Sequence, residues 1–192
     1  MAKIVVTNHV SLDGVMQSPA SPDEDPRDGF QHGGWAFANN DEVMARKMGE
    51  RMSRPGALLL GRRTYEHFYS YWPKQPDNPI TDVLNRRQKY VVSRTLSEPL
   101  PWMNSTLVKG DEVAALKERS EEDLSVLGSG DLLRTLIREG LVDEYVLLIH
   151  PVMLGSGRRL FPDGAPVGLE LVEVITTTTG VIIATYRTKE TR

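Results

Sequence analysis

Three short segments combine glycine, hydroxyl and arginine residues directly after runs of apolar residues. They are Gly61-Arg62-Arg63-Thr64, Ser93-Arg94 and Gly128-Ser129-Gly130. Proteins bind phosphate groups with backbone N–H groups at helix N-termini and in glycine turns, while an arginine fork supplies the charge. Each segment alone is also typical of an ordinary turn beside a solvated charge. Their shared pattern favours one phosphate site built from all three.

The apolar runs before these segments are typical of buried strands, because they are short and bounded by turn residues. In an open parallel sheet the carboxyl ends of the strands form the ligand crevice, so the three junctions would meet at one edge. The pattern predicts strands at residues 3–10, 57–60, 89–93, 105–108, 124–127 and 144–149, and a hairpin of residues 169–175 and 181–187. It predicts a helix that Asn39 or Asn40 caps and Pro55-Gly56 ends, and further helices at 64–71, 80–87, 111–119 and 131–138. Strands alternating with helices indicate an α/β fold with a mostly parallel sheet and an antiparallel C-terminal hairpin.

The composition is that of an ordinary globular protein, with 192 residues of which 40% are hydrophobic and 26% charged, and we expect one domain over residues 1–192. The net charge of −3 gives no electrostatic reason to bind nucleic acid or an acidic membrane. The chain has no cysteine, and its four histidines lack metal-ligand spacing. No apolar run approaches the roughly 20 residues of a membrane span, and no signal segment precedes the first strand. We therefore expect a cytoplasmic protein with no metal, no nucleic acid and no membrane partner.

Four stretches of the chain occur together in the order of a known family. They are Ser11-Leu12-Asp13-Gly14, Leu60-Gly61-Arg62-Arg63-Thr64-Tyr65-Glu66, Lys89-Tyr90-Val91-Val92-Ser93-Arg94-Thr95-Leu96 and His150-Pro151-Val152-Met153-Leu154-Gly155-Ser156-Gly157. Over residues 3–188 the chain resembles the dihydrofolate reductase-like family that includes the reductase domain of bacterial riboflavin biosynthesis. The resemblance implies a three-layer fold with helices on both faces of the sheet, and NADPH as the cofactor.

The resemblance also implies roles for individual residues. The adenosine 2′-phosphate of NADPH would be held by Arg62, Ser93 and Arg94. The pyrophosphate would be held by Thr64 and Gly128-Ser129-Gly130, and Gly61 and Leu132 would complete the cofactor site. The substrate would contact Met16, Trp35 and Leu154, and the long loop of residues 16–34 would be a mobile lid.

Dihydrofolate reductases place a carboxylate on the helix that follows the lid, and the matching position here is Asn40. The resemblance therefore disfavours folate reduction and leaves Asp13 as the candidate catalytic carboxylate. An aspartate in an Asp-Gly pair is equally typical of a turn. Two interpretations also stay open for His150 and Trp35, which would either face a ligand or serve the structure, and for Arg158-Arg159, which would either bind a substrate phosphate or face solvent.

These features together predict an NADPH-dependent reductase of a small heterocyclic substrate. The predicted activity resembles that of the 5-amino-6-(5-phosphoribosylamino)uracil reductase of riboflavin biosynthesis, and the predicted assembly is a homodimer. One alternative is a non-catalytic NADPH-binding or sensor protein, which the missing helix carboxylate favours. A dihydrofolate reductase and a purely structural homodimer are the remaining alternatives.

Overall fold

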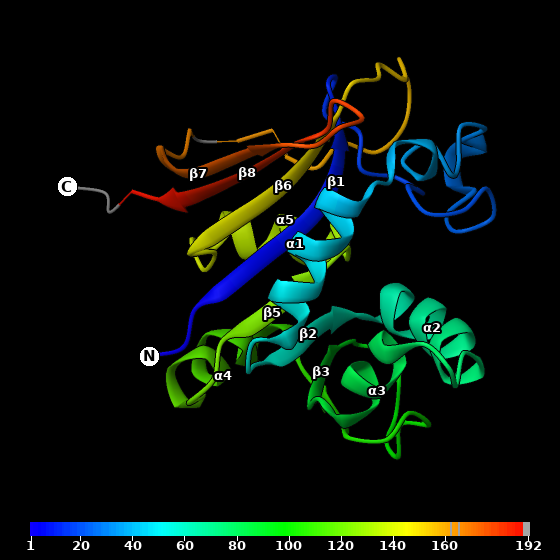
Figure 1. The fold of residues 1–192 in the computed structure, drawn as a ribbon. Helices are drawn as coiled ribbons and strands as arrows, with labels where there is room; N and C mark the ends of the chain where they lie inside the picture. The colour runs from blue at the N-terminus through cyan, green and yellow to red at the C-terminus, as the bar shows by residue number, and fades with distance from the viewer. Residues whose placement is uncertain (162, 165, 190–192) are drawn as a thin grey trace. The chain divides into compact units, whose positions relative to one another are not determined.

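The computed structural model describes residues 1–161, 163–164 and 166–189 (Figure 1). The strands are β1 (Ile4–Ser11), β2 (Ala57–Gly61), β3 (Lys89–Val92), β4 (Ser105–Val108), β5 (Leu124–Leu127), β6 (Glu144–His150), β7 (Leu169–Thr176) and β8 (Ile182–Thr188). The α-helices are α1 (Glu42–Ser53), α2 (Arg62–Tyr71), α3 (Pro79–Arg86), α4 (Val113–Arg119) and α5 (Gly130–Arg138). The elements predicted from the sequence are all found, with ends that differ by a few residues.

The eight strands form one mixed sheet in the order β4-β3-β2-β5-β1-β6-β8-β7. Strand β2 pairs in parallel with both β3 and β5, and β3 pairs in parallel with β4. Strand β8 is antiparallel to both of its neighbours, β6 and β7. The predicted α/β fold, with a mostly parallel sheet and an antiparallel C-terminal hairpin, is therefore confirmed.

The chain divides into two compact units, each assembled from two stretches of sequence. Unit 1 comprises residues 1–6 and 48–142, and unit 2 comprises residues 7–47 and 143–192. Strand β1 and helix α1 therefore each contribute residues to both units. We expect a single domain over residues 1–192, because the sequence shows no linker that would divide the chain. This stays a prediction.

Unit 1 is organised around β2, whose Leu58, Leu59 and Leu60 are fully buried. Helix α2 packs on β2 and β3, and helix α5 packs on β2. The core cluster consists of Leu58, Leu60, Tyr65, Leu84, Val91 and Trp102. The buried Tyr65 hydroxyl accepts the backbone N–H of Trp102 at 2.9 Å, so its polar atom has a partner inside the core. This packing fixes the first turn of α2 directly after the end of β2.

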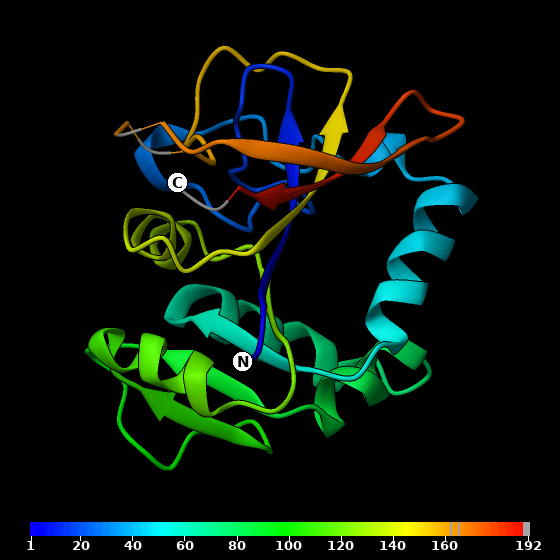
Figure 2. The ribbon, with the colours of Figure 1, turned by 90° about the vertical axis from the view of Figure 1, so that its left-hand side faces the viewer.

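Unit 2 contains the antiparallel part of the sheet, where β6, β8 and β7 lie side by side (Figure 2). Strand β6 is mostly buried, as expected for an interior strand with a long apolar run. Strand β7 is the outermost strand, most of its residues are exposed, and its register shifts between Leu171 and Glu173. The sheet thus ends in an open edge at β7.

The N-cap of α1 differs from the sequence prediction, because Asp41 caps the helix instead of Asn39 or Asn40. The Oδ1 atom of Asp41 accepts the backbone N–H of Met44 at 2.8 Å. Its Oδ2 atom accepts the N–H and the hydroxyl of Thr178, each at 2.6 Å. All three residues are able to cap a helix, and the bonds to the β7–β8 turn select Asp41. These hydrogen bonds, with that of Thr178 first, lower the pKa of Asp41.

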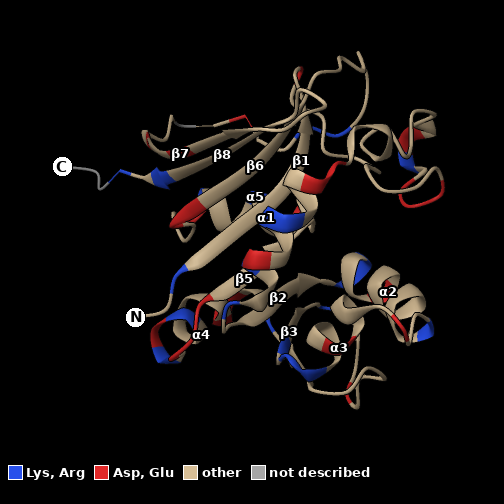
Figure 3. Ribbon diagram, viewed as in Figure 1, with Lys and Arg blue, Asp and Glu red and all other residues tan. Residues whose placement is uncertain are grey.

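Charged residues of both signs are interspersed along the elements of each unit (Figure 3). Within the described part of the chain, no helix combines the length and the apolar character that crossing a membrane requires.

Candidate functional site

Two of the three predicted phosphate-binding segments are joined by hydrogen bonds in unit 1. The backbone N–H of Gly61 donates to Oγ of Ser129 at 2.9 Å. The backbone N–H of Ser129 donates to Oγ1 of Thr64 at 3.0 Å. The end of β2, the first turn of α2 and the turn after β5 therefore form one connected structure, which we name the phosphate cradle.

The turn after β5 has the backbone conformation of an anion-binding turn. Gly128 and Ser129 have left-handed φ angles of 63° and 61°. Helix α5 begins at once, and its first internal hydrogen bond runs from the N–H of Leu133 to the carbonyl of Ser129, at 2.8 Å. The N–H groups of Gly130 and Leu132, which precede that hydrogen bond, therefore have no acceptor within the helix. Together with the positive end of the helix dipole they favour a bound anion.

The third segment meets the cradle through a hydroxyl group that the sequence analysis did not single out. Oγ of Ser93 accepts the N–H groups of Thr95 and Leu96, each at 3.1 Å, and so closes the turn after β3. Oγ1 of Thr95 accepts a hydrogen bond from Nη1 of Arg62 at 3.0 Å. Arg62 also lies 3.9 Å from the carboxylate of Glu66 through its Nε atom. Oγ of Ser93 lies 3.4 Å from the same Oγ1 atom of Thr95, so Arg62 and Ser93 meet at one hydroxyl group.

Arg94 was predicted from the sequence as a cofactor-binding residue, whereas Thr95 was not. Thr95 lies inside the family-like stretch of residues 89–96, so the signal was present, as a hydroxyl two residues after Ser93. Arg94 has an exposed side chain. Arg94 therefore lies within the turn that Ser93 closes, with its side chain exposed.

The residues of the cradle fit the phosphates of a dinucleotide. A Cβ atom at Gly61 would lie 3.5 Å from Cβ of Leu132 and 3.6 Å from Oγ of Ser129, which are ordinary contact distances. The φ angle of Gly61 is −76°, which any residue adopts. Protein packing alone therefore does not require glycine here, whereas close approach of a phosphate to the backbone would. Arginine, hydroxyl and N–H donors are the set that phosphates need.

Asp13 lies in unit 2, where its carboxylate links the turn after β1 to the segment after β6 through hydrogen bonds. It accepts the hydroxyl of Ser11 at 2.6 Å, the N–H of Leu154 at 3.1 Å and the N–H of Gly155 at 2.8 Å. These hydrogen bonds, with that of Ser11 first, lower the pKa of Asp13 to about 2. The carboxylate is consequently ionised at neutral pH, and it is suited to act as an anion or hydrogen-bond acceptor and not as a proton donor.

The three predicted substrate residues also lie in unit 2. Sδ of Met16 accepts a hydrogen bond from Nδ2 of Asn8 at 3.5 Å. Nε1 of Trp35 donates to the carbonyl of Gln17 at 2.8 Å, and its ring meets the ring of His150 edge-on at a centroid distance of 5.2 Å. Leu154 is tied to Asp13 through its N–H group. Trp35 thus anchors the loop of residues 16–34, in agreement with the structural interpretation, and its contact with a substrate stays a prediction.

That loop is closed by hydrogen bonds to one buried side chain, Gln17. Its Nε2 atom donates to the carbonyls of Asp25 and Arg27, each at 3.0 Å, and its Oε1 atom accepts the N–H of Arg158 at 2.9 Å. The guanidinium of Arg158 also pairs with Asp28 at 2.9 Å. Arg158 therefore holds the loop, which is neither of the roles considered for it from the sequence, and the loop's function as a lid stays a prediction.

His9 and His150 form a hydrogen-bonded pair that the sequence did not reveal. Nδ1 of His9 lies 2.8 Å from Nε2 of His150. His150 is fully buried, and its Nδ1 atom has no hydrogen-bond partner among the residues that the structure describes. Burial lowers the pKa of both imidazoles to about 4, and the charge of His150 adds to the effect at His9. Both rings are therefore neutral at pH 7, and His150 serves the interior of unit 2.

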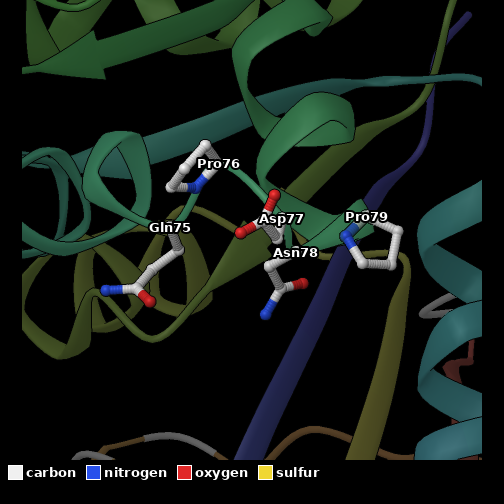
Figure 4. A pocket seen from close by; sticks show the side chains of 5 residues that line it. All are labelled: Gln75, Pro76, Asp77, Asn78 and Pro79. Atoms are coloured by element: carbon white, nitrogen blue, oxygen red, sulfur yellow. The ribbon is translucent and has the colours of Figure 1, made fainter.

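Two concave features lie outside the predicted residue set. An open depression of about 370 Å³ in unit 1 is lined by Gln75, Pro76, Asp77, Asn78 and Pro79 (Figure 4). One of its polar side chains is already used, because Oδ1 of Asn78 caps α3 by accepting the N–H of Ile80 at 3.0 Å. The second feature is a cavity of about 90 Å³ in unit 2, lined by His9, Pro19, Ala20, Ala36, Phe37 and Asn40, which we name the His9 cavity.

No group of three or more possible ligand side chains is gathered as a metal site anywhere in residues 1–161, 163–164 and 166–189.

Comparison with known proteins identifies the family of the chain. Residues 2–183 match the family model of the RibD C-terminal domain. The chain belongs to the RibD C-terminal domain family. A relative in Bacillus subtilis, the uncharacterized protein YyaP, is 35% identical over 138 residues, which are 67% of this chain and 72% of YyaP.

Solved structures share the fold of this RibD C-terminal domain family member. A putative riboflavin biosynthesis protein from Shewanella sp. PV-4 aligns with a TM-score of 0.68 at 22% identity, covering 99% of this chain and 100% of that one. A dihydrofolate reductase from Enterococcus faecalis, complexed with NADP(H), aligns with a TM-score of 0.60 at 15% identity, covering 98% and 97%. The dihydrofolate reductase-like fold predicted from the sequence is confirmed.

Proposed function

We propose that the protein is an NADPH-dependent reductase of a small heterocyclic substrate, resembling 5-amino-6-(5-phosphoribosylamino)uracil reductase. The observation that carries this proposal is the phosphate cradle, in which Ser129 joins the turns after β2 and β5. Membership of the RibD C-terminal domain family supports the reductase class. The fold shared with a reductase that was solved with NADP(H) supports the cofactor.

The residues of the phosphate cradle and of the turn after β3 divide into two groups by the phosphate that each would hold. Gly61, Thr64, Leu132 and the turn Gly128-Ser129-Gly130 would bind the pyrophosphate. The hydroxyl of Thr64 and the N–H groups of Gly130 and Leu132 would donate to it, while Gly61 would leave room for it beside the backbone. Arg62, Ser93 and Arg94 would bind the 2′-phosphate, with Thr95 fixing the guanidinium of Arg62. When bound, NADPH supplies a hydride, and the protein contributes binding, orientation and electrostatics.

In unit 2, Met16, Trp35 and Leu154 would bind the substrate, and Asp13 would act as a fixed negative charge. Its low pKa makes Asp13 an orienting anion at neutral pH, because it carries no proton to donate. The same observation favours a second candidate, a sensor that binds NADPH without turnover. The carboxylate of Asp41 accepts hydrogen bonds from Thr178 and Met44, and the His9–His150 pair is neutral at pH 7. None of these groups is therefore a good proton donor to a substrate.

Cofactor binding and turnover are separable by experiment. We expect millimolar NADPH to raise the melting temperature of the protein by several degrees, because a ligand that binds only the folded state stabilises it. Oxidation of NADPH at 340 nm with a panel of pyrimidines, pterins and quinones then distinguishes the reductase from the sensor. If neither NADPH nor NADH changes the melting temperature, the proposed function is wrong.

We expect the Arg62→Ala and Arg94→Ala variants to weaken NADPH binding roughly 10-fold or more and NADH binding far less. The reason is that a charge-assisted hydrogen bond to the 2′-phosphate contributes about 1.5–3 kcal/mol, and NADH lacks this phosphate. Dissociation constants from isothermal titration of both cofactors measure the difference. Arg138→Ala, at the far end of α5, removes the same charge and serves as the control. Equal losses for NADPH and NADH would contradict the assignment.

A further inference from the structure

The two ends of the loop of residues 16–34 are joined by hydrogen bonds within unit 2. The N–H of Gly34 donates to the carbonyl of Ser18 at 2.8 Å. The indole of Trp35 donates to the carbonyl of Gln17 at 2.8 Å. A compact loop whose ends meet and whose interior is filled by its own side chains is an Ω-loop, which is a folded element although it has little regular structure.

The interior of the loop is filled by two polar side chains, Gln17 and Ser18, each 3% exposed. Nε2 of Gln17 donates to the carbonyls of Asp25 and Arg27, each at 3.0 Å. Oγ of Ser18 donates to the carbonyl of Ser21 at 2.9 Å and accepts the N–H of Asp25 at 3.1 Å. These side chains therefore supply the backbone of the loop with the hydrogen-bond partners that regular structure would otherwise provide.

A close approach of the chain to itself also fixes the path of the loop. A Cβ atom at Gly33 would lie 2.5 Å from the carbonyl oxygen of Pro22 and 2.6 Å from its Cα atom. Both distances are shorter than an ordinary contact of a Cβ atom, so only glycine fits at this point. The two strands of the loop are therefore packed together with no space for a side chain between them.

The loop is attached along one side to the segment after β6. Oε1 of Gln17 accepts the N–H of Arg158 at 2.9 Å, and the N–H of Met16 donates to the carbonyl of Arg158 at 2.9 Å. The buried ring of Phe30 lies against Gly157, where a Cβ atom would come within 2.7 Å of Cε2 of the ring. One side chain, that of Gln17, thus binds both the interior of the loop and the neighbouring segment.

These contacts differ from those of a segment that opens readily, which has few buried contacts and many exposed hydrogen bonds. Opening of the loop would break the bonds of the Gln17 side chain to Asp25, Arg27 and Arg158 in one step. The same step would expose the ring of Phe30 to water, which is unfavourable for an apolar surface. Opening is therefore cooperative, and the open state is rare.

We propose that Gln17 is a positioning residue that fixes the loop of residues 16–34 as a rigid wall of unit 2, in place of the mobile lid that the resemblance implies. The wall holds two predicted substrate residues, Met16 and Trp35, through the N–H of Met16 and the indole of Trp35. Its contribution to a reaction is constant geometry and not gating.

The proposal rests on the proposed function only in calling Met16 and Trp35 substrate residues. The rigidity of the loop does not depend on NADPH, and it is measured without any ligand. Failure of cofactor binding and failure of this proposal are therefore separate results.

The first measurement is amide hydrogen exchange of the unmodified full chain, resolved by residue with NMR. The open state of a lid is typically populated at roughly 0.1–10%, which allows exchange within about 1,000-fold of the unfolded rate. We expect the amides of Asp25 and Gly34 to exchange more than about 1,000-fold more slowly than in an unfolded chain. Faster exchange at either amide would overturn the proposal.

The second measurement compares Gln17→Met with Gln31→Met, a matched control at an exposed position of the same loop. Methionine is close to glutamine in size but makes none of the three hydrogen bonds of the Gln17 side chain. We expect Gln17→Met to speed exchange at Asp25 and Gly34 at least about 10-fold, since each hydrogen bond lost corresponds to roughly that factor. The amides of β6 should keep their rates, and Gln31→Met should change neither region.

A milder variant, Gln17→Asn, retains the amide but is one methylene group shorter, and it should change the rates in the same direction. It decides the outcome if Gln17→Met does not fold. Unchanged exchange of the loop in the Gln17 variants would overturn the proposal. An equal gain in rate in β6, or in Gln31→Met, would also overturn it, because Gln17 would then act on overall stability or share its effect with an exposed residue.

Discussion

At the scale of single residues, Gly61 separates what packing requires from what a ligand requires. The nearest side-chain atom to a Cβ at this position would be 3.5 Å away, and the backbone conformation suits any residue. By contrast, Gly128 has a φ of 63°, so a side chain there is strained whatever the space around it.

We therefore expect Gly61→Ala to fold with unchanged or slightly higher stability and to bind NADPH at least about 10-fold more weakly. An alanine that the folded state tolerates stabilises by about 0.4–1 kcal/mol through the unfolded chain, while its methyl group occupies the space that a phosphate needs. Urea denaturation and NADPH titration measure the two effects. Gly128→Ala is the comparison, in which stability should fall. If Gly61→Ala binds NADPH normally, the phosphate does not approach this residue.

The His9–His150 pair predicts how stability depends on pH. The pKa of each imidazole is about 4 in the folded protein, below its ordinary value of 6.5. Between these values the unfolded chain binds more protons than the folded one, so the free energy of unfolding falls as the pH falls from 6.5 to 4 and then levels. The loss is on the order of 3 kcal/mol for fully buried His150, at about 1.4 kcal/mol per pKa unit.

Urea denaturation at several values between pH 8 and pH 4 tests this expectation. The fall should shrink in His9→Gln and persist in His32→Gln, because His32 is exposed. The pKa of Asp13 is also lowered, to about 2, so this carboxylate adds to the fall only as the pH drops below its ordinary value of 3.8. An equal fall in all three proteins would mean that the pair is not the cause.

At the scale of elements, a buried lysine at the start of β3, Lys89, binds the C-terminal end of helix α3. Nζ of Lys89 donates to the carbonyls of Leu84 and Arg87, each at 2.7 Å, and to that of Asn85 at 3.3 Å. The same ammonium lies 4.6 Å from the ring centroid of Trp102. Burial lowers the pKa of Lys89 to about 8, which leaves the group largely charged at pH 7. The lysine thus joins the end of α3 to β3.

We expect Lys89→Met to lower the free energy of unfolding by about 2–3 kcal/mol, because it leaves the terminal carbonyls of α3 without their charged donor. Chemical denaturation measures the loss, with the exposed Lys74→Met as the control. A loss below about 0.5 kcal/mol, the size typical of surface substitutions, would contradict this account.

The sequence predicts the elements better than their connections. The runs before Gly61 and Gly128 are apolar and bounded by glycine, so both strands are recognised locally. The cap of α1 is not, because three adjacent residues can cap it and the choice depends on Thr178, which is 137 residues away from Asp41. The pairing of His9 with His150 spans 141 residues. Such contacts leave no periodic signal in the sequence.

At the scale of the whole molecule, the homodimer stays a prediction, and β7 is the surface that favours it. As the outermost strand it presents unpaired backbone groups along its edge. Leu171, Val172 and Val174 are 53%, 47% and 54% exposed. An exposed apolar edge strand is an association site unless it is covered, and a second copy of the chain is the occupant that we expect.

Val174→Lys should therefore convert the dimer to a monomer in sedimentation equilibrium. Glu170→Lys, on the same strand, also alters the charge but removes no apolar side chain, and it should leave the dimer intact. A monomeric wild-type protein, or a Val174→Lys variant that still dimerises, would count against this edge.

The two hydrogen bonds of Ser129 have a consequence for the thermodynamics of recognition. They hold the turns after β2 and β5 together within unit 1. The conformational entropy of these turns is therefore lost when the protein folds, and it is not lost a second time when a ligand binds. Little of the interaction energy is therefore lost to rearrangement of the protein, and more of it remains as affinity for the phosphate.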